Sequence, residues 1–351
     1  MQPGPKPIPP PRKMIAPMLF VGALVYLLFV RKLPSESLSN TDIVEINGQA
    51  MGTTWMVKIP GHVDEPNKIA DSIQEQIELI NKSMSTYLAD SEITQFNELK
   101  GTRPYEVSEH FHNVLSLSLE IHQQSKGAFD ITIAPAVRAW GFGHEPAQEA
   151  PSAELKQELQ RVVGSSLLQL GPQHLTKSNP EIEIDLSAVA KGYAVDVVSE
   201  WLITAGFPNH LVELGGELRA SGKRFNSAWI VGIELPTLQH SGHIQSIPLQ
   251  GMGMATSGDY RNYRIQDGER VSHTIDPRTL EPVSHNLASV TVIAEQAAVA
   301  DAWATALSVL GPAEGLELAK AKNLDTLMLI RTADGFSTVS TAHFPQPSDS
   351  Q

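Results

Sequence analysis

The segment AVADAWATALSVLGP, residues 298–312, combines a helix suited to burial with two polar side chains. Small and apolar residues dominate it, and Gly311 followed by Pro312 is a typical stop signal for a helix. Asp301 and Thr305 are four residues apart, so their oxygens share one face of an α-helix. Either Thr305 bonds back to a helix carbonyl and Asp301 is solvated, or the two oxygens form part of a cation site. The Ala-rich surroundings favour the cation site, because a buried carboxylate needs a partner or a metal ion.

The ligand types available to such a cation are oxygens. The chain contains no cysteine, and its histidines do not form a metal-binding cluster in the sequence. Carboxylate, hydroxyl and carbonyl oxygens suit Mg²⁺ better than Zn²⁺. The absence of cysteine also rules out a disulfide and a lipid-modified cysteine.

The elements on both sides of this segment indicate a mixed fold. Apolar spacing predicts helices over residues 66–82, 106–126 and 188–204, and residues 144–160 read as a polar surface excursion. Strand patterns occur at 43–61, 181–185, 211–222, 228–233, 253–265, 287–294 and 326–331. Because these elements do not alternate regularly as βαβ units, we predict one α+β domain over residues 41–345, followed by a polar tail, 346–351.

The first 40 residues differ from the rest of the chain. A basic, proline-rich start precedes MIAPMLFVGALVYLLFV, residues 14–30, which has no charge, and a polar linker follows. Seventeen residues is the short end of what spans a bilayer. We expect an uncleaved inner-membrane anchor with the following domain in the periplasm. A cleaved signal peptide and a cytoplasm-facing anchor are the alternatives.

The charge balance argues against nucleic acid as a partner. Residues 1–40 contain five basic residues and one acid, which leaves 21 basic and 38 acidic residues, a net charge of −17, in the rest. Nucleic-acid binding needs a basic footprint that this body lacks. An anionic ligand would therefore need a metal ion or directed backbone N–H groups.

The segment DLSAVAKGYAVD, residues 185–196, predicts a tight turn that enters a helix. The start of a helix after a strand binds anions readily, and Lys191 would add a positive charge. The spacing does not match a Walker motif, and the chain also lacks G-x-S-x-G, H-E-x-x-H and G-x-G-x-x-G. A phosphate-bearing ligand and an ordinary capped helix with a surface lysine remain equal alternatives.

Other chemistry-bearing residues lie in loops. The segment SHTIDPRTLEPVSHN, residues 272–286, is stiffened by two prolines and presents two histidines and two acids. Tyr87 and Phe129 are aromatic side chains that would stack on a flat ligand if they were not part of the core. The pairs of small residues at Gly215–Gly216 and Ser257–Gly258 indicate bulges or close backbone approaches.

Taken together, eight segments in order, spanning about residues 45–335, resemble the ApbE family of FAD:protein FMN transferases. They are MGTTW, STY…DSEI..FN, GAFDITIAP, IDLSAVAKGYAVD, ELGGELRASG, MATSGDYRNY, SHTIDPRT and ADAWATALSVLG. The resemblance implies an ApbE-like domain. It also implies an enzyme that uses FAD and Mg²⁺, moves the FMN half of FAD onto a Thr or Ser hydroxyl of an acceptor protein, and releases AMP.

The resemblance also implies roles for individual residues and partners. The metal ligands would be Asp301, Thr305 and the backbone oxygen of Ala188. The acceptors would be subunits of respiratory flavoproteins such as the Na⁺-translocating NADH:quinone reductase or the Rnf complex. The FAD contacts would be Met51, Tyr87, Ala128, Phe129, Asp130, Asp185, Lys191 and Ile275.

The acceptor hydroxyl is a poor nucleophile at neutral pH, so transfer needs a base or strict alignment. His273 is the candidate base, Asp276 would orient it or fix the loop, and His285 is expected to be structural. The family's usual loop glycine is replaced by Leu280, which puts the conformation of this loop in question.

Two other functions share most of these features. In one, water replaces the acceptor hydroxyl and the protein is a Mg²⁺-dependent FAD pyrophosphatase. In the other, it is a membrane-anchored flavin-binding assembly factor without turnover.

Overall fold

The computed structural model describes residues 42–142, 150–236, 242–258, 263–266 and 269–347. Residues from Ile43 onward form one compact unit. The predicted anchor, residues 14–30, lies outside the described residues. Within the described ranges, no helix is both long and apolar enough to cross a membrane.

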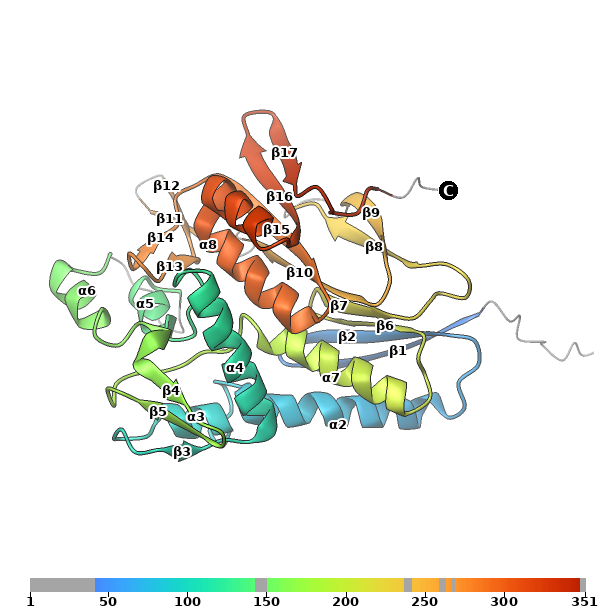
Figure 1. The fold of residues 1–351 in the computed structure, drawn as a ribbon, viewed down its shortest axis with the longest axis horizontal. Helices are drawn as coiled ribbons and strands as arrows, with labels where there is room; N and C mark the ends of the chain where they lie inside the picture. Colours follow the sequence, from blue (N-terminus) through green and yellow to red (C-terminus); the bar gives the residue numbers. More distant parts are fainter. Residues whose placement is uncertain (1–41, 143–149, 237–241, 259–262, 267–268, 348–351) are drawn as a thin grey trace, which may run out of the picture. The chain divides into compact units, whose positions relative to one another are not determined.

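An eight-stranded antiparallel sheet forms the centre of this unit (Figure 1). Its hydrogen-bonded order brings together strands from both ends of the chain, which explains why no βαβ regularity is visible in the sequence. In spatial order the strands are β1 (Ile43–Ala50), β2 (Thr53–Pro60), β6 (His210–Leu214), β7 (Glu217–Ser221), β10 (Met252–Gly258), β15 (Leu287–Ala294), β16 (Asp325–Thr332) and β17 (Gly335–Ser340).

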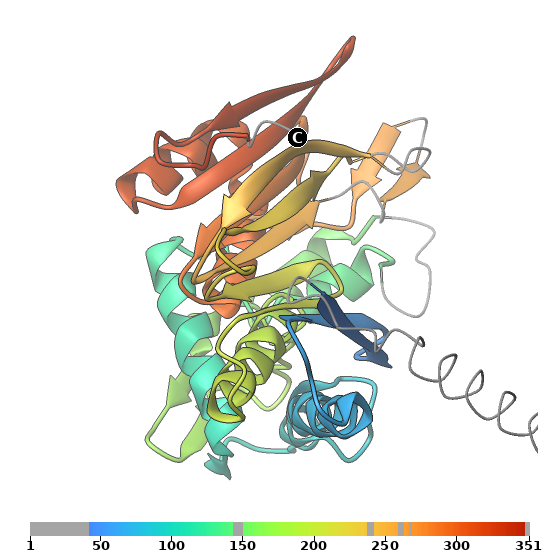
Figure 2. The same ribbon diagram turned by 90° about the vertical axis from the view of Figure 1, so that its right-hand side faces the viewer.

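Both faces of the sheet are covered, so its inner strands are buried on two sides. Helices α2 (Pro66–Met84), α7 (Ala190–Thr204) and α8 (Ala297–Ala321) pack on one face. The hairpin β8 (Trp229–Glu234) and β9 (His243–Leu249) packs on the other. The period-two alternation of a strand separates the two layers: Leu211 joins the hairpin's apolar cluster, whereas Val212 joins the cluster of α2 and α7. Within this unit, α2 and the β16–β17 pair lie at opposite ends (Figure 2).

A second helical layer packs on α8. Helix α4 (Glu109–Gln124) shares the largest core cluster with α8, together with the short helix α3 (Glu92–Asn97). A small sheet beside it has the order β3 (Tyr105–Glu106), β5 (His174–Lys177), β4 (Leu168–Leu170), and a 3₁₀ turn, η1 (Ser165–Leu167), precedes β4.

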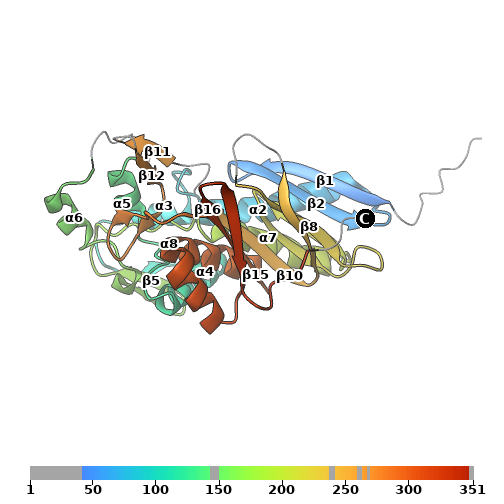
Figure 3. The same cartoon turned by 90° about the horizontal axis from the view of Figure 1, so that it is seen from above.

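Short elements gather at one end of the molecule (Figure 3). They are α5 (Ala134–Ala139), α6 (Ala153–Leu159), β11 (Tyr263–Gln266), β12 (Glu269–Ser272), β13 (Ile275–Asp276) and β14 (Glu281–Pro282).

The predicted mixed helix and sheet architecture is confirmed, and three helices lie within a few residues of their expected ranges. The predicted strand at 181–185 is wrong: Ile182 to Asp185 run without a strand partner. The backbone groups of Ile184 and the carbonyl of Ile182 bond to side chains instead, as described below. The predicted helix stop at Gly311 is confirmed, because that glycine has a non-helical backbone, φ 76 and ψ −177. A second helical stretch follows from Pro312 to Ala321, and both stretches are included in α8. Within the predicted surface excursion, α6 buries Leu159.

Candidate functional site

The predicted site is built where the first turns of α7 and α8 meet. Gly192 of α7 lies so close to α8 that an added Cβ would be 2.5 Å from the carbonyl oxygen of Ala297. One turn further along α7, Asp196 accepts hydrogen bonds of 2.9 Å from the backbone N–H groups of Ala297 and Ala298. Asp196 therefore caps α8 from a neighbouring helix. This contact fixes the two helix starts against each other.

Asp301 lies inside this junction. Its side chain is buried, with 6% of the residue exposed, and its Oδ2 accepts a hydrogen bond of 3.2 Å from the N–H of Gly192. Burial raises the pKa of Asp301, although Lys191 and the Gly192 N–H act to lower it. Thr305, one turn along the same face, is half-buried. The interpretation in which Asp301 is solvated is therefore wrong.

Lys191 points toward a second carboxylate that the sequence pattern does not single out. Its Nζ lies 2.5 Å from Oε2 of Glu217, at the start of β7. Within the described residues this Oε2 has no other hydrogen-bond donor. Burial lowers the pKa of Lys191, but the charges of Glu217 and Asp301 outweigh it, so the pKa is raised. Burial and the charge of Asp301 together raise the pKa of Glu217.

The three groups Lys191, Glu217 and Asp301 form one buried charge cluster with an excess of negative charge. When all three are ionised they carry a net charge of −1. Burial is the main cause of the raised pKa of both carboxylates, and the charge of Asp301 raises that of Glu217 further. No group of three His, Cys, Asp or Glu side chains forms a metal cage among the described residues. A cation beside Asp301 would thus be held by one carboxylate, a hydroxyl and a carbonyl oxygen, a donor set that suits Mg²⁺. The residues present fit this ion.

The turn before α7 contains Asp185 and Ala188. Oδ1 of Asp185 accepts a hydrogen bond of 2.8 Å from the N–H of Ser187, which closes an Asx turn. Ala188 is half-buried and lies two residues before the first residue of α7. The turn thus places a backbone carbonyl and a carboxylate next to the start of the helix that carries Lys191.

Met51 belongs to the turn of the β1–β2 hairpin. Ala50 pairs with Thr53, so Met51 and Gly52 form a two-residue turn, and both have positive φ, 49 and 73. This hairpin lies close to Lys191. A Cβ on Gly215 would be 2.8 Å from Cγ2 of Thr53 and 3.4 Å from Cδ of Lys191.

Tyr87 and Phe129 have opposite environments. Tyr87 is 81% exposed. Phe129 is buried in the main core, so the predicted stacking of its ring on a ligand is wrong. Ala128 is buried as well. Any contact of these two residues with FAD would go through the backbone.

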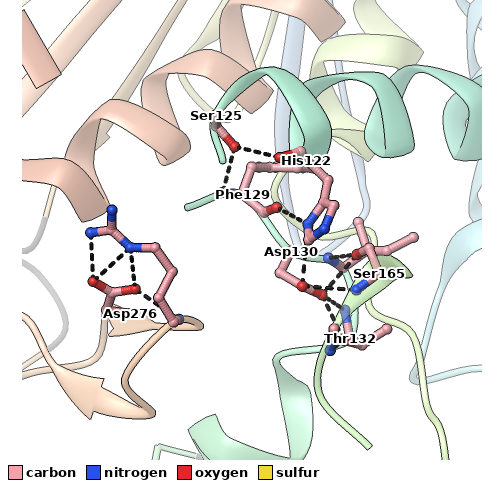
Figure 4. Close-up of polar contacts among 10 residues, drawn as sticks. His122, Ser125, Phe129, Asp130, Thr132, Ser165 and Asp276 are labelled. Carbon is pink, nitrogen blue, oxygen red and sulfur yellow. Dashed lines mark hydrogen bonds and ion pairs between the residues drawn. The ribbon is translucent and has the colours of Figure 1, made fainter. Parts of the chain in front are cut away.

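The carboxylate of Asp130 is hydrogen-bonded to several neighbouring residues of the protein (Figure 4). Its carboxylate accepts hydrogen bonds from the N–H and hydroxyl of Thr132 at 2.8 and 2.6 Å, and from the N–H and hydroxyl of Ser165 at 2.9 and 2.8 Å. The ring of His122 lies 3.3 Å away. Burial raises the pKa of Asp130, but these donors outweigh it and lower the pKa overall. Asp130 therefore orders the loop that contains it.

The proline-braced loop is held by a second carboxylate. Asp276 accepts from the backbone N–H of Arg278 at 2.9 Å and from its guanidinium at 2.8 to 3.2 Å, as Figure 4 shows at Asp276. The guanidinium also bonds Glu314 of α8 at 2.9 Å. Asp276 thus fixes the loop. Ile275 is buried, and His273 is half-buried with its ring edge-to-face to Phe142, 6.3 Å between centroids.

Leu280 adopts the conformation that the usual glycine would favour. Its φ is 61, and its carbonyl accepts a hydrogen bond of 2.8 Å from the indole of Trp140. A left-handed leucine costs roughly 1–2 kcal/mol. Burial of its side chain beside Trp140 offsets this cost. His285 packs against the Gly311 kink, where an added Cβ would be 2.4 Å from the ring, as expected for a structural residue.

The structure brings Lys191 and Asp301 together. It places Asp185, Ala188 and Met51 on the turns beside them. Sequence reasoning missed Glu217, Asp196 and Asn97. Glu217 lies in a quoted motif, but Glu213 in the same motif has the same side chain, so the sequence alone does not single it out.

The sequence and the overall fold both match those of a known family. The ApbE family model matches residues 51–328, so the chain belongs to the ApbE family.

The relatives cover nearly the whole chain. An FAD:protein FMN transferase of Haemophilus influenzae is 38% identical over 347 residues, which is 95% of this chain and 97% of the relative. The flavin transferase ApbE of Vibrio cholerae has a TM-score of 0.78 and 36% identity over 86% of this chain and 98% of that one. The flavinyl transferase ApbE of Pseudomonas stutzeri has a TM-score of 0.79 and 35% identity, covering 86% and 96%.

Proposed function

We propose that this protein is an enzyme that transfers the FMN moiety of FAD onto a Thr or Ser hydroxyl of an acceptor protein and releases AMP. Family membership and the FAD:protein FMN transferases among its relatives support the transfer. The observation that carries the site is the buried carboxylate of Asp301. It has a single hydrogen-bond donor among the described residues and lies in a cluster with surplus negative charge.

Mg²⁺ would be held by Asp301, Thr305 and the backbone oxygen of Ala188. The contact between Gly192 and Ala297 supports this, because it packs the turn before α7 against the start of α8. When bound, the ion would neutralise charge on the FAD pyrophosphate and make its phosphorus more electrophilic.

Lys191 and the start of α7 would bind the pyrophosphate. The ammonium is held by Glu217, and the first backbone N–H groups of a helix are directed toward an anion. Tyr87 would stack on a ring of FAD with its exposed face. Met51, Asp185, Ile275 and the backbone of residues 128–130 complete the proposed contacts.

In the transfer step, the oxygen of the acceptor hydroxyl forms a bond to the phosphorus on the FMN side. The bond from that phosphorus to the bridging oxygen breaks, and AMP leaves with this oxygen. The hydroxyl proton passes to a base, for which we propose His273. The Asp276–Arg278 contacts hold the loop that presents it.

We further propose a location and acceptors for the reaction. An uncleaved segment at residues 14–30 would anchor the protein in the inner membrane, with the catalytic domain in the periplasm. The acceptors would be subunits of respiratory flavoproteins, of the Na⁺-translocating NADH:quinone reductase or Rnf type.

The test is mass spectrometry of an acceptor subunit after incubation with the protein, FAD and Mg²⁺. We expect covalent FMN on a Thr or Ser and an equal amount of AMP. Free FMN and AMP without labelled acceptor would instead identify an FAD pyrophosphatase. Bound FAD without AMP release would identify a binding protein without turnover.

A further inference from the structure

The segment Ile182–Ile184 has no partner strand, and a side chain makes the hydrogen bonds that such a strand would make. The carboxamide of Asn97 makes two hydrogen bonds with the same residue: its Oδ1 accepts from the N–H of Ile184 at 2.8 Å, and its Nδ2 donates to the carbonyl of Ile184 at 2.9 Å. This pair of bonds is what an antiparallel partner strand would supply. Ile182 and Ile184 are buried on the core side, so the segment needs these bonds.

Lys177 also links the C-terminal end of α3 to the segment Ile182–Ile184. It is only 1% exposed, and its ammonium donates to the carbonyls of Phe96 and Asn97 at 3.3 Å and of Ile182 at 3.0 Å. An ammonium has three N–H donors, and these carbonyls accept all of them. The carbonyls of Phe96 and Asn97 are at the C-terminal end of α3, where a cation is favourable. Asn97 and Lys177 together form what we call the α3 brace.

The α3 brace connects parts of the proposed FAD site that are distant in the sequence. Helix α3 starts after the turn that contains Tyr87, and its cap Ser91 also bonds to the carbonyl of Ser85 at 2.6 Å. On the other side, Asp185 follows the braced segment directly. Its N–H donates to the carbonyl of Ile131 at 2.7 Å, which ties the segment to the loop of Asp130. The brace thus sets the position of the Asp185–Ala188 turn relative to both neighbours.

We infer that Asn97 is a positioning residue for the FAD and metal site, because its carboxamide fixes the backbone of Ile184 and, through it, the Asp185–Ala188 turn. This inference rests on the proposed function. The side chain of Asn97 bonds the backbone of Ile184, and Asn97 is not one of the residues proposed to contact FAD or Mg²⁺. Displacing a ligand-bearing turn by about 1 Å reduces catalysis or affinity by roughly 100-fold, and the loss of an outer partner of a metal site reduces affinity by about 10–100-fold.

The experiment compares Asn97→Ala and Asn97→Asp with the matched control Asn113→Ala in the full chain. Asn97→Asp keeps the acceptor for the Ile184 N–H but loses the donor to its carbonyl, so it tests the brace with almost unchanged volume. Asn113 is an exposed asparagine on α4 whose Nδ2 donates a long hydrogen bond of 3.5 Å to the hydroxyl of Tyr193.

Two readouts separate positioning from general stability. Hydrogen exchange without FAD or metal should become faster at residues 182–187 in both Asn97 variants, and should stay at the wild-type rate in α2. FAD affinity at saturating Mg²⁺, measured by calorimetry, should fall by about 10–100-fold in Asn97→Ala. It should stay within twofold of wild type in Asn113→Ala.

The inference is overturned if both Asn97 variants bind FAD within twofold of wild type, or if their exchange changes equally across the whole fold. If wild-type protein binds FAD but labels no acceptor, the proposed transfer fails instead. The brace is then still decided by exchange and FAD affinity, which do not need turnover.

Discussion

Asp130 and Asp301 are both buried carboxylates in segments that resemble the family motifs, yet the protein treats them in opposite ways. Asp130 receives four hydrogen bonds from Thr132 and Ser165, and its pKa is lowered despite burial. Asp301 receives one, from Gly192, within the described residues, and burial raises its pKa. A carboxylate with satisfied lone pairs organises a loop, whereas one with unsatisfied lone pairs is available to a ligand. Motif membership does not distinguish the two roles, but the number of donors does.

The largest expected effect is on catalysis. Asp301→Ala should slow FMN transfer by about 1000-fold, because it removes the only carboxylate proposed to hold Mg²⁺. The variant should fold normally, because burial already disfavours the ionised carboxylate of Asp301, and removing it therefore does not destabilise the fold. Acceptor labelling followed by mass spectrometry across a range of Mg²⁺ concentrations measures this. Retention of more than a tenth of wild-type activity at low Mg²⁺ would contradict the metal assignment.

The counterpart is a loss of stability at Asp130. Asp130→Asn should lower the free energy of unfolding by about 3 kcal/mol at pH 7. The NH₂ group of the new asparagine would face the N–H donors of Thr132 or Ser165, and at least one buried donor would lose its acceptor. The native pKa lies below the ordinary value of 3.8, so this stabilisation is present above that pH and is lost as pH falls through the native pKa. Urea unfolding at pH 7 and pH 3 should therefore show the two proteins converging in acid. A difference that does not shrink would contradict this role.

The response of stability to Mg²⁺ should distinguish the role of Asp301 from that of Asp130. At a 20-fold excess over its dissociation constant, Mg²⁺ should stabilise the wild type by about 2 kcal/mol. Asp301→Asn should show no such gain, while Asp130→Asn should keep it. Urea unfolding with MgCl₂, against NaCl of equal ionic strength, is the measurement. The comparison breaks down if Asp130→Asn also loses the response.

The smallest effect concerns His122, the titratable donor beside Asp130. The hydrogen bond to Asp130 raises the pKa of His122, and burial acts against it. The stabilisation from this pair is thus fully present below pH 6.5 and is lost as pH rises through the native pKa. His122→Gln should cost about 1 kcal/mol at pH 6 and less at pH 9, as measured by urea unfolding. An equal cost at both pH values would argue against a charged pair.

The parts of the fold that follow local patterns could be predicted from the sequence. Helix α7 and strand β15 occur where apolar spacing places them. The segment at 181–185 has the same alternation as a strand, but its hydrogen-bond partner is a side chain 87 residues away, and no local pattern encodes that. Strands β9 and β17 were also missed, because exposed or mixed residues weaken their alternation.

The site shows the same limit. Asp301 and Lys191 were predicted because each lies in a helix with recognisable context. Glu217 was not, because only the strand pairing of β6 and β7 brings it to Lys191. The ring of Phe129 has the chemistry of a stacking platform, and only its burial shows that it belongs to the core.

The cap that Asp196 places on α8 has a consequence for motion. Because two backbone N–H groups of α8 are fastened to α7, the helices that carry Lys191 and Asp301 cannot rotate independently without breaking both bonds. The two bonds therefore fix the backbone that carries Lys191 relative to the backbone that carries Asp301 before any ligand arrives. The adjustments that admit an acceptor protein must then come from the loops around the pair and not from the pair itself.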